Sequence, residues 1–395
     1  VNTKEGIYLN GGKLVNGKTV LTSKEGYYHG NTRDVTFKKK VLLNGPDYKI
    51  TTDTLLYNIN TDIVTFVCPT KIKTGKRTIK TSEGWYNLKS KQAWFGSRPV
   101  IDDSSYTLVA DSIHFNDSTG MGRLRGKVIY SSKDSVGGFD LTAGYLDINK
   151  KTNTLLATDT PILIIKQNKD SIYITADTLY GEPLDKLTRT THVPTLRDST
   201  YKVSSDSSSN RYFRGYHNVK IFSDSMQAVG DSMFYSLKDS IFRLFTNPIV
   251  WTNDNQIMGD TIYMYTWHKK PEKMRVIENA TAINKLNEKY FNQVSGNVIN
   301  AFFNNGEISH IYTKGSPANN VYYAQDEHNK FIGVNKSSSD VINVYMANNK
   351  AEKVTFINNL EGTMYPMGQV NHEDIKVRHF KWDDSRKPKN KFFKP

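Results

Sequence analysis

Apolar and polar residues alternate along most of the chain, and this alternation predicts β-strands. The stretches 106–115, 171–180 and 256–265 are rich in β-branched and aromatic residues, as half-buried strands are. Clusters of Asn, Asp, Ser and Gly, such as 116–120, separate these stretches and are typical of turns. No segment shows a convincing helical period over more than two turns. The pattern therefore predicts an all-β protein.

A degenerate repeat of roughly thirty residues is superimposed on this alternation. Its mark is an acidic residue followed by a small one, as in Asp53-Thr54, Asp111-Ser112, Asp177-Thr178, Asp231-Ser232 and Asp260-Thr261. Weaker copies stand at Glu25-Gly26, Glu83-Gly84, Ala143-Gly144 and Ser295-Gly296. A fixed period of this length predicts stacked units, none of which can bury its apolar face alone.

The apolar positions change parity at each mark. Leu108 and Ala110 share one parity, whereas Ile113 and Phe115, which follow Asp111, share the other. Such a slip would turn the apolar set outward unless the chain bends there. We therefore expect the dipeptide to form a corner, with the Asp side chain accepting a hydrogen bond from a backbone N–H two residues on.

A second mark lies in the other half of each repeat. A Pro or Gly precedes an apolar run at Pro69, Pro99, Gly126, Pro161 and Pro248. Since proline cannot donate a hydrogen bond to a sheet, it belongs at strand starts, bulges or edges. The recurrence places these residues along one seam of the stack, and it favours an open seam over a closed barrel.

The segment 182–210 interrupts the repeats, because it is polar and contains a run of serines. The predicted organisation is an N-terminal β-repeat region at 1–181 and a polar insertion loop at 182–210. A second β-repeat region at 211–361 continues the stack, and a basic C-terminal tail follows at 362–395.

Composition and charge narrow the possible functions. Hydrophobic residues make up only 37% of the chain, but 23 Tyr and 18 Phe argue against disorder. The formal net charge of +14 indicates an anionic partner. Nucleic acid is disfavoured, because no Arg-rich helix, zinc-ligand set or RNA-binding aromatic motif accompanies the charge. Cys68 is the single cysteine, so an internal disulfide is excluded.

The sequence offers little catalytic chemistry. No phosphate-binding loop, nucleophile elbow, zinc helix or calcium loop is present. His372 and His379 are the nearest metal-ligand pair, but no carboxylate pattern supports them. We therefore predict a protein that is not an enzyme, with no catalytic residue, metal or cofactor. A polysaccharide-active β-helix enzyme with two carboxylates remains an alternative.

The candidate site is the apolar interior between the strands. In a closed stack its side chains would be ordinary core, but if two sheets splay they would line a groove for acyl chains, with Lys and Arg meeting phosphates at the rim. The residues expected to face inward are Leu55, Tyr57, Phe66, Trp85, Ile113, Phe115, Ile162, Leu179, Met233, Tyr235, Trp251, Ile262 and Met264.

The succession of motifs resembles a known family, the LptA/OstA-like periplasmic proteins of lipopolysaccharide transport. The resemblance rests on Leu108-Val-Ala-Asp-Ser-Ile-His-Phe and Ile174-Thr-Ala-Asp-Thr-Leu-Tyr, and on second halves like Leu124-Arg-Gly-Lys-Val-Ile-Tyr. It implies an elongated open β-jellyroll, a folded-over "β-taco" of stacked antiparallel strand repeats. The chain looks like a longer OstA-like member, with an insertion and without an outer-membrane barrel.

The resemblance also implies a function and partners. Lipopolysaccharide or lipid A would be bound by its acyl chains, with Leu55, Ile113, Phe115, Leu179, Met233 and Ile262 facing the lipid, and transferred across the periplasm toward the outer membrane. Other OstA/Lpt-type domains would add at edge strands, and copies could associate head to tail. The expected location is the periplasm, after removal of a signal peptide, with association to the outer membrane as an option. The rival hypothesis is a structural or adhesive β-repeat protein with a packed interior.

Overall fold

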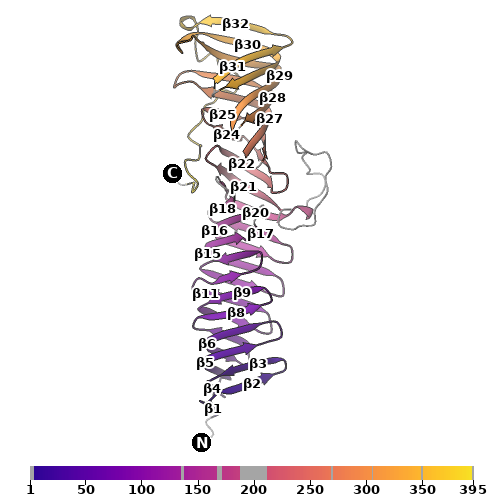
Figure 1. Cartoon of the computed structure of the whole chain (residues 1–395), viewed down its shortest axis with the longest axis vertical. Coiled ribbons are helices and arrows are strands. Elements are labelled where there is room, and N and C mark those ends of the chain that lie inside the picture. The colour runs from indigo at the N-terminus through magenta and orange to yellow at the C-terminus, as the bar shows by residue number, and fades with distance from the viewer. Residues whose placement is uncertain are drawn as a thin grey trace. The chain divides into compact units, whose positions relative to one another are not determined.

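The structure, a computed structural model, describes residues 4–134, 138–166, 171–186, 211–267, 270–304, 306–347 and 350–393. The chain divides into two compact units. The first comprises 1–165 with 180–182, and the second comprises 166–179 with 183–395. Strands dominate both units, as the alternation predicts, and they are stacked along each unit in chain order (Figure 1). The prediction of an all-β fold of stacked antiparallel strands is confirmed.

The first unit consists of two antiparallel sheets that face each other. Sheet 1 contains β2 (Gly12–Asn16), β3 (Thr19–Ser23), β8 (Thr70–Thr74), β9 (Arg77–Thr81), β12 (Val100–Asp102), β13 (Tyr106–Val109) and β18 (Ile162–Ile165). Sheet 2 contains β1 (Glu5–Tyr8), β4 (Glu25–His29), β7 (Ile63–Phe66), β10 (Glu83–Asn87), β11 (Gln92–Gly96), β14 (Ser112–Asn116) and β17 (Thr154–Thr158). Four longer strands pass through both sheets: β5 (Asp34–Asn44), β6 (Lys49–Asn58), β15 (Met121–Ser132) and β16 (Phe139–Asn149).

The second unit repeats this plan. Sheet 3 contains β19 (Ile172–Thr175), β24 (Ile249–Thr252), β25 (Asn255–Met258) and β32 (Glu361–Pro366). Sheet 4 contains β23 (Ile241–Phe245), β26 (Thr261–Trp267) and β31 (Lys350–Ile357). Long strands pass through both sheets: β21 (Arg211–Phe222), β22 (Gln227–Ser236), β27 (Lys270–Lys285), β28 (Phe291–Asn304), β29 (Glu307–Gln325) and β30 (Phe331–Ala347).

Three short elements complete the described chain. They are the strand β20 (Thr178–Pro183), the 3-10 turn η1 (Leu184–Lys186) and the 3-10 turn η3 (Met367–Gln369). The predicted insertion at 182–210 falls largely on residues 187–210, which lie outside the described residues.

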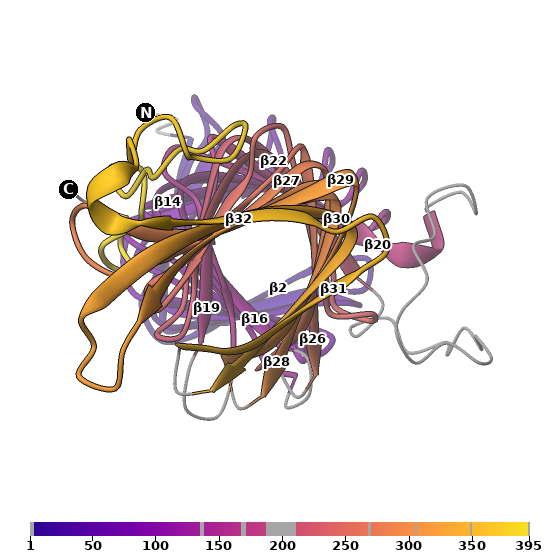
Figure 2. The same cartoon turned by 90° about the horizontal axis from the view of Figure 1, so that it is seen from above.

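In each unit the chain crosses from one sheet to the other at a corner, and all corners lie on the same edge. Seen from above, β31 and β32 meet at such a corner and diverge from it (Figure 2). The hairpin turns of each sheet occupy the opposite edge, where the backbone ladders of the described residues do not join the two sheets. The described part of each unit is therefore a folded-over jellyroll, joined along the corner edge and open along the turn edge.

The acidic-small marks lie at these corners, as their parity change predicts. Asp111 stands between β13 and β14, and Asp260 stands between β25 and β26. Pro69, Pro99 and Pro161 lie at corners too. The expectation that the prolines mark the open seam is therefore wrong, since that edge is where the sheets are joined. Proline is tolerated there because the ladder breaks at a corner.

Corner side chains hold neighbouring corners together. Arg98 donates to the Asp111 carboxylate at 2.9 Å, Asn218 donates to Asp177 at 2.8 Å, and Asn279 donates to Asp260 at 3.1 Å. The carboxylates thus accept from the side chain of an adjacent corner, in place of the expected backbone N–H two residues on. The donor corner carries left-handed residues, with φ of 59° at Arg98 and 49° at Asn279. Asn adopts this region more readily than most residues do.

The corner bond of the second unit can be tested at Asn279. Asn279→Ala removes the hydrogen bond to Asp260 and places a residue that disfavours the left-handed region at φ 49°. We expect a loss of about 1–2 kcal/mol in the free energy of unfolding, measured with urea. Asn279→Gly removes only the hydrogen bond and should cost less than Asn279→Ala. Equal stability of Asn279→Ala and the wild type would contradict a structural role for the corner.

Candidate functional site

The inner faces of the first unit are built from continuous rows of paired residues. In sheet 1 an aliphatic row runs across the strands through cross-strand pairs: Leu14, Leu21, Leu43, Ile50, Ile72, Ile79, Ile101 and Leu108. Sheet 2 contributes two rows. The row near the corners contains Phe37, Leu55, Phe66, Gly84, Phe95 and Ile113, and the row near the turns contains Val35, Tyr57, Val64, Tyr86, Ala93 and Phe115.

Gly84 occupies a tight position in the corner row. The rings of Phe66 and Phe95 stand on either side of it, with their centroids 6.4 Å apart. A Cβ atom at Gly84 would lie 2.4 Å from the carbonyl oxygen of Trp94, so a larger residue does not fit. The glycine thus lets two large rings share one inner face.

A cavity of about 630 Å³ lies between these rows. Its apolar lining comes from both sheets and includes Leu21, Ile50, Ile72, Leu55, Phe95 and Phe115. Polar groups line it as well, from the turns of the open edge: Asp47, Tyr48, Asp62, Lys89, Lys91 and Asp117. The arrangement has apolar walls and a polar opening, which is the form of a site for a largely hydrophobic ligand.

Two tyrosines stand between the apolar wall and the polar opening. Tyr57 donates a hydrogen bond to Asp62 at 2.9 Å. Burial, as the larger cause, and this hydrogen bond raise the pKa of Tyr57 to about 12. Burial and the charge of Asp117 raise the pKa of Tyr86 to about 12. Both hydroxyls are therefore neutral at physiological pH, and they offer hydrogen bonds to a ligand without adding charge.

Beyond the cavity, ion pairs cross the open edge. Arg77 of sheet 1 lies 3.8 Å from Asp117 of sheet 2, and Asp103 of sheet 1 lies 3.7 Å from Lys150 of sheet 2. Arg77 also lies 3.7 Å from Asp103. We call these four residues the clasp, because they link the turns of sheets that have no backbone ladder between them.

The clasp is partly shielded from water. Burial and the nearby charge of Arg77 lower the pKa of Lys150. Burial opposes ionisation of Asp103, but Lys150 and hydrogen bonds outweigh it and lower the pKa of Asp103. The lowered pKa of Asp103 keeps its carboxylate charged at neutral pH.

The expected inward residues of the first unit divide into two groups. Leu55, Tyr57 and Phe115 line the cavity, while Phe66 and Ile113 lie on the same inner face, in the corner row. Trp85 and Ile162 do not face inward, which corrects their expected orientation. Trp85 is on the outer face beside the exposed His114, with ring centroids 6.1 Å apart, and in β18 it is Leu163 and Ile165 that are buried, not Ile162.

In the second unit most of the expected residues are inner. Leu179 is fully buried. Met233 and Ile262 belong to one inner row of sheet 4, while Tyr235 and Met264 belong to the next. Trp251 is an exception and corrects the expectation, because it lies on the outer face of sheet 3. Its indole N–H donates to Gln256 at 3.2 Å, and Gln256 in turn bonds the backbone of the C-terminal segment at Lys381 and Asp383.

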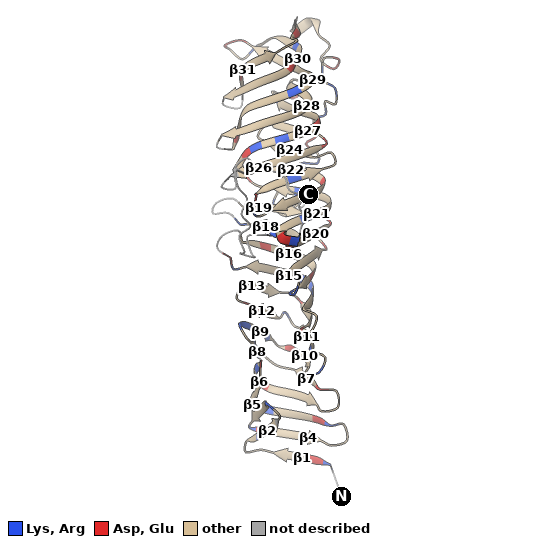
Figure 3. Ribbon diagram, turned by 90° about the vertical axis from the view of Figure 1, so that its right-hand side faces the viewer, with Lys and Arg blue, Asp and Glu red and all other residues tan. Residues whose placement is uncertain are grey.

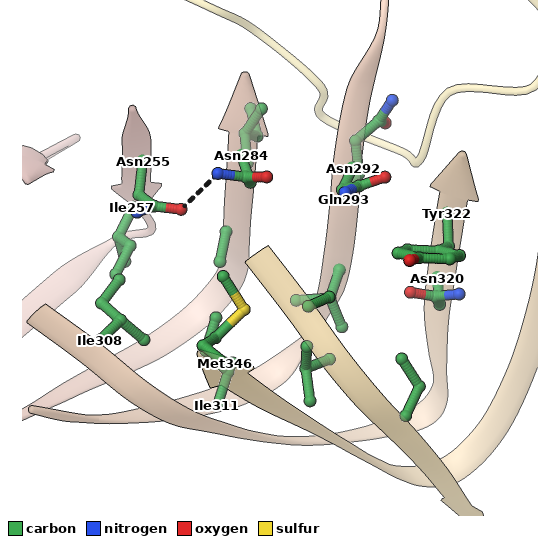
Figure 4. Close-up of a pocket in the computed structure, with 16 residues that line it drawn as sticks. Asn255, Ile257, Asn284, Asn292, Gln293, Ile308, Ile311, Asn320, Tyr322 and Met346 are labelled. Atoms are coloured by element: carbon green, nitrogen blue, oxygen red, sulfur yellow. Dashed lines mark hydrogen bonds between the residues drawn. The ribbon is translucent and has the colours of Figure 1, made fainter. Parts of the chain in front are cut away.

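The second unit has smaller pockets, one of about 260 Å³ beside Asn335 and Lys353 and one of about 40 Å³ between its two sheets. Asn255 and Asn284, hydrogen-bonded at 3.0 Å, lie on the wall formed by sheet 3 together with Asn292 and Tyr322 (Figure 4). Ile308, Ile311 and Met346 of sheet 4 face them (Figure 4). Both pockets are well below the 630 Å³ of the cavity in the first unit, so that cavity is the better candidate site.

Sequence reasoning missed several residues of the site, among them Arg77, Tyr86, Lys89 and Lys91. Tyr57 and Tyr86 could have been found together, since each directly precedes an Asn of the open-edge turns. Asn58 and Asn87 accept hydrogen bonds from the backbone two and three residues on, which fixes the turn and hence the inward orientation of the preceding tyrosine. No such signal marks Arg77.

The chain was compared with known proteins. Residues 2–53 match the family model described as "OstA-like protein". The N-terminal segment 2–53 is therefore similar to the OstA-like family. This match confirms the family relationship predicted from the repeats, and it covers β1 to β5 and the beginning of β6 in the first unit.

The chain is also similar to a solved structure. That structure is LptH, the LptA homologous periplasmic component of the conserved lipopolysaccharide transport device from Pseudomonas aeruginosa. The identity is 13%, the match covers 44% of this chain and 82% of that chain, and the TM-score is 0.18. At these values the similarity carries no argument about function. No curated protein matches the chain.

Two further searches concern the described residues alone. In that part of the chain no helix has the length and apolar character needed to span a membrane. Within the same residues no group of three or more His, Cys, Asp or Glu side chains gathers to hold a metal ion.

The raised pKa of Tyr86 can be measured by alkaline titration. We expect the difference in tyrosinate absorbance between the wild type and Tyr86→Phe to develop near pH 12 in the folded protein. In the unfolded chain the same group ionises near pH 10. Its contribution to stability is therefore complete below pH 10 and is lost as the pH rises to about 12. A difference signal that develops at pH 10 in folded protein would show that Tyr86 is freely solvated.

Proposed function

We propose that this protein binds lipopolysaccharide by its acyl chains and transfers it across the periplasm toward the outer membrane, without catalytic turnover. The observation that carries the proposal is the cavity of about 630 Å³ between apolar rows. The lining residues Leu14, Leu21, Phe37, Leu43 and Ile50 fall within the OstA-like segment at 2–53. The family match and the cavity thus lie in the same part of the chain, and both support the proposal.

The open edge supports entry of a lipid from the side. Turns of the two sheets meet there without a backbone ladder among the described residues, so opening that edge breaks no strand pairing. Lys89 and Lys91 line the cavity at its opening, where they would meet phosphate groups. Other basic and acidic positions are dispersed along each unit (Figure 3). The overall charge of +14 suits an anionic ligand.

Partners would bind at the first and last strands. Ile7, Leu9 and Val15 are 63%, 59% and 59% exposed on or beside β1 and β2, which are large values for aliphatic residues. At the other end of the described chain, three large apolar residues are exposed: Ile357 in β31, Leu360 between the two strands and Met364 in β32. Such strands offer unpaired backbone groups to another OstA-like domain or to a second copy of this chain.

Photo-crosslinking tests the proposed lipid site. A photoreactive phenylalanine analogue at Tyr57 or Tyr86 should crosslink to lipopolysaccharide when the protein is made in a Gram-negative periplasm, because both positions line the cavity. The matched control is Trp85, the neighbour of Tyr86 on the outer face. Crosslinked lipopolysaccharide is detected as a mobility shift with specific antibody.

The pattern of crosslinks decides between the hypotheses. Crosslinks at Tyr57 and Tyr86 that are absent at Trp85 would support binding inside the jellyroll. No crosslink at any of the three positions would favour the structural hypothesis of a packed interior. Equal crosslinking at Trp85 would place the lipid on the outer surface and contradict the proposed site.

A further inference from the structure

Arg77 is a largely buried cation at the wall of the cavity of the first unit. Its side chain is only 12% exposed, and it comes from the start of β9, next to the open edge. The guanidinium lies over the ring of Phe115, with 5.0 Å between its central carbon and the ring centroid. Both residues line the cavity. A positive charge is thus held beside a large apolar space.

One nitrogen of the Arg77 guanidinium, Nε, makes no hydrogen bond within the described part of the chain. This nitrogen is buried. The nearest carboxylates, Asp103 and Asp117, lie 3.7 and 3.8 Å away, which is beyond hydrogen-bond distance. A buried donor without an acceptor costs about 1–3 kcal/mol, so native structures rarely leave one unless something else supplies the acceptor.

We propose that Arg77 is the anchor for the anionic head group of an amphiphile whose hydrocarbon tail fills the cavity. A phosphate or carboxylate beside the guanidinium would accept from Nε and from a terminal nitrogen together, in the bidentate geometry that arginine favours. The aliphatic row from Leu14 to Ile79 would then enclose the tail. This inference rests on the proposed lipid function and adds a head-group site inside the fold, behind Lys89 and Lys91.

The two carboxylates of the clasp offset the positive charges of its two basic residues. Asp117 faces Arg77 from the turn after β14, and Asp103 faces both Arg77 and Lys150 from the turn after β12. The formal charges of the two basic and two acidic residues of the clasp sum to zero. An entering anion competes with Asp117 for the guanidinium, so removal of the Asp117 charge should strengthen binding.

The test measures binding of tail-matched ligands to the full chain by isothermal titration calorimetry. Dodecyl phosphate is the anionic probe, dodecanol is the neutral probe, and inorganic phosphate is the probe without a tail. We expect the wild type to bind dodecyl phosphate at least about tenfold more tightly than dodecanol, since a hydrogen bond to a charged group contributes about 1.5–3 kcal/mol and 1.4 kcal/mol is tenfold. Inorganic phosphate should bind at least a hundredfold more weakly.

Substitutions then show which residue causes the preference for dodecyl phosphate over dodecanol. Arg77→Gln should abolish the preference for dodecyl phosphate while dodecanol binding persists, and Arg77→Lys should keep part of the preference. Arg98→Gln is the matched control, because Arg98 is an exposed, ion-paired arginine of the same unit at the corner edge. It should bind both probes as the wild type does. Asp117→Asn should bind dodecyl phosphate several-fold more tightly, a gain that misfolding cannot produce.

The outcomes separate this inference from the proposed function. Equal affinity of the wild type for dodecyl phosphate and dodecanol, or an unchanged preference in Arg77→Gln, would overturn the Arg77 anchor and leave a lipid cavity. Failure of both amphiphiles to bind would overturn the lipid function itself, and the anchor with it. If inorganic phosphate binds as tightly as dodecyl phosphate, the proposal that the ligand is an amphiphile is wrong, and the site binds a free small anion.

Discussion

The architecture of both units depends on the corner, where the backbone changes register by one residue. A β-strand presents alternate side chains to alternate faces, so a chain that folds over at a corner must shift its parity to keep its apolar residues inside. The corner achieves this with left-handed residues on one strand and a carboxylate on the next, as in Asn279 and Asp260. Side chains of one corner bond the carboxylate of another, as Arg98 bonds Asp111 and Asn279 bonds Asp260, and these bonds help to align the strands of both sheets.

The residues placed on the inner faces decide whether the interior is filled or hollow. In the second unit Met233, Tyr235, Phe242 and Met264 are long side chains that span the distance between the sheets. In the first unit the inner row of sheet 1 is aliphatic, and its short residues face the two rows of sheet 2 across a cavity of about 630 Å³. The same backbone plan thus gives pockets of about 40 and 260 Å³ in the second unit and a larger, ligand-sized space in the first.

The corners and the all-β fold could be predicted because they repeat. A mark such as Asp111-Ser112 recurs along the chain, and the apolar residues before and after it have opposite parity. Both sets can face the interior only if the chain bends at the mark. Single inward residues were less predictable. Trp85 and Tyr86 are adjacent and both large, so the pattern favours neither until the register with β7 and β11 is known. Trp251 is buried for a reason no local pattern contains, since the segment that covers it lies 125 residues beyond Gln256.

The open edge explains why the charges of the site lie where they do. A lipid can enter a jellyroll from the side only if the two sheets are not joined there by a ladder, yet two apolar faces with an unsealed edge would admit water. Under the proposed function, ion pairs such as Arg77 with Asp117, 3.8 Å apart, would close that edge and would give way to an incoming anion. A hydrophobic seal would be displaced by the hydrocarbon tail and would not distinguish one amphiphile from another. Under the same proposal, charged groups at the edge of an apolar cavity would combine closure with selection for the head group, and this combination requires that Arg77 have no strong internal partner.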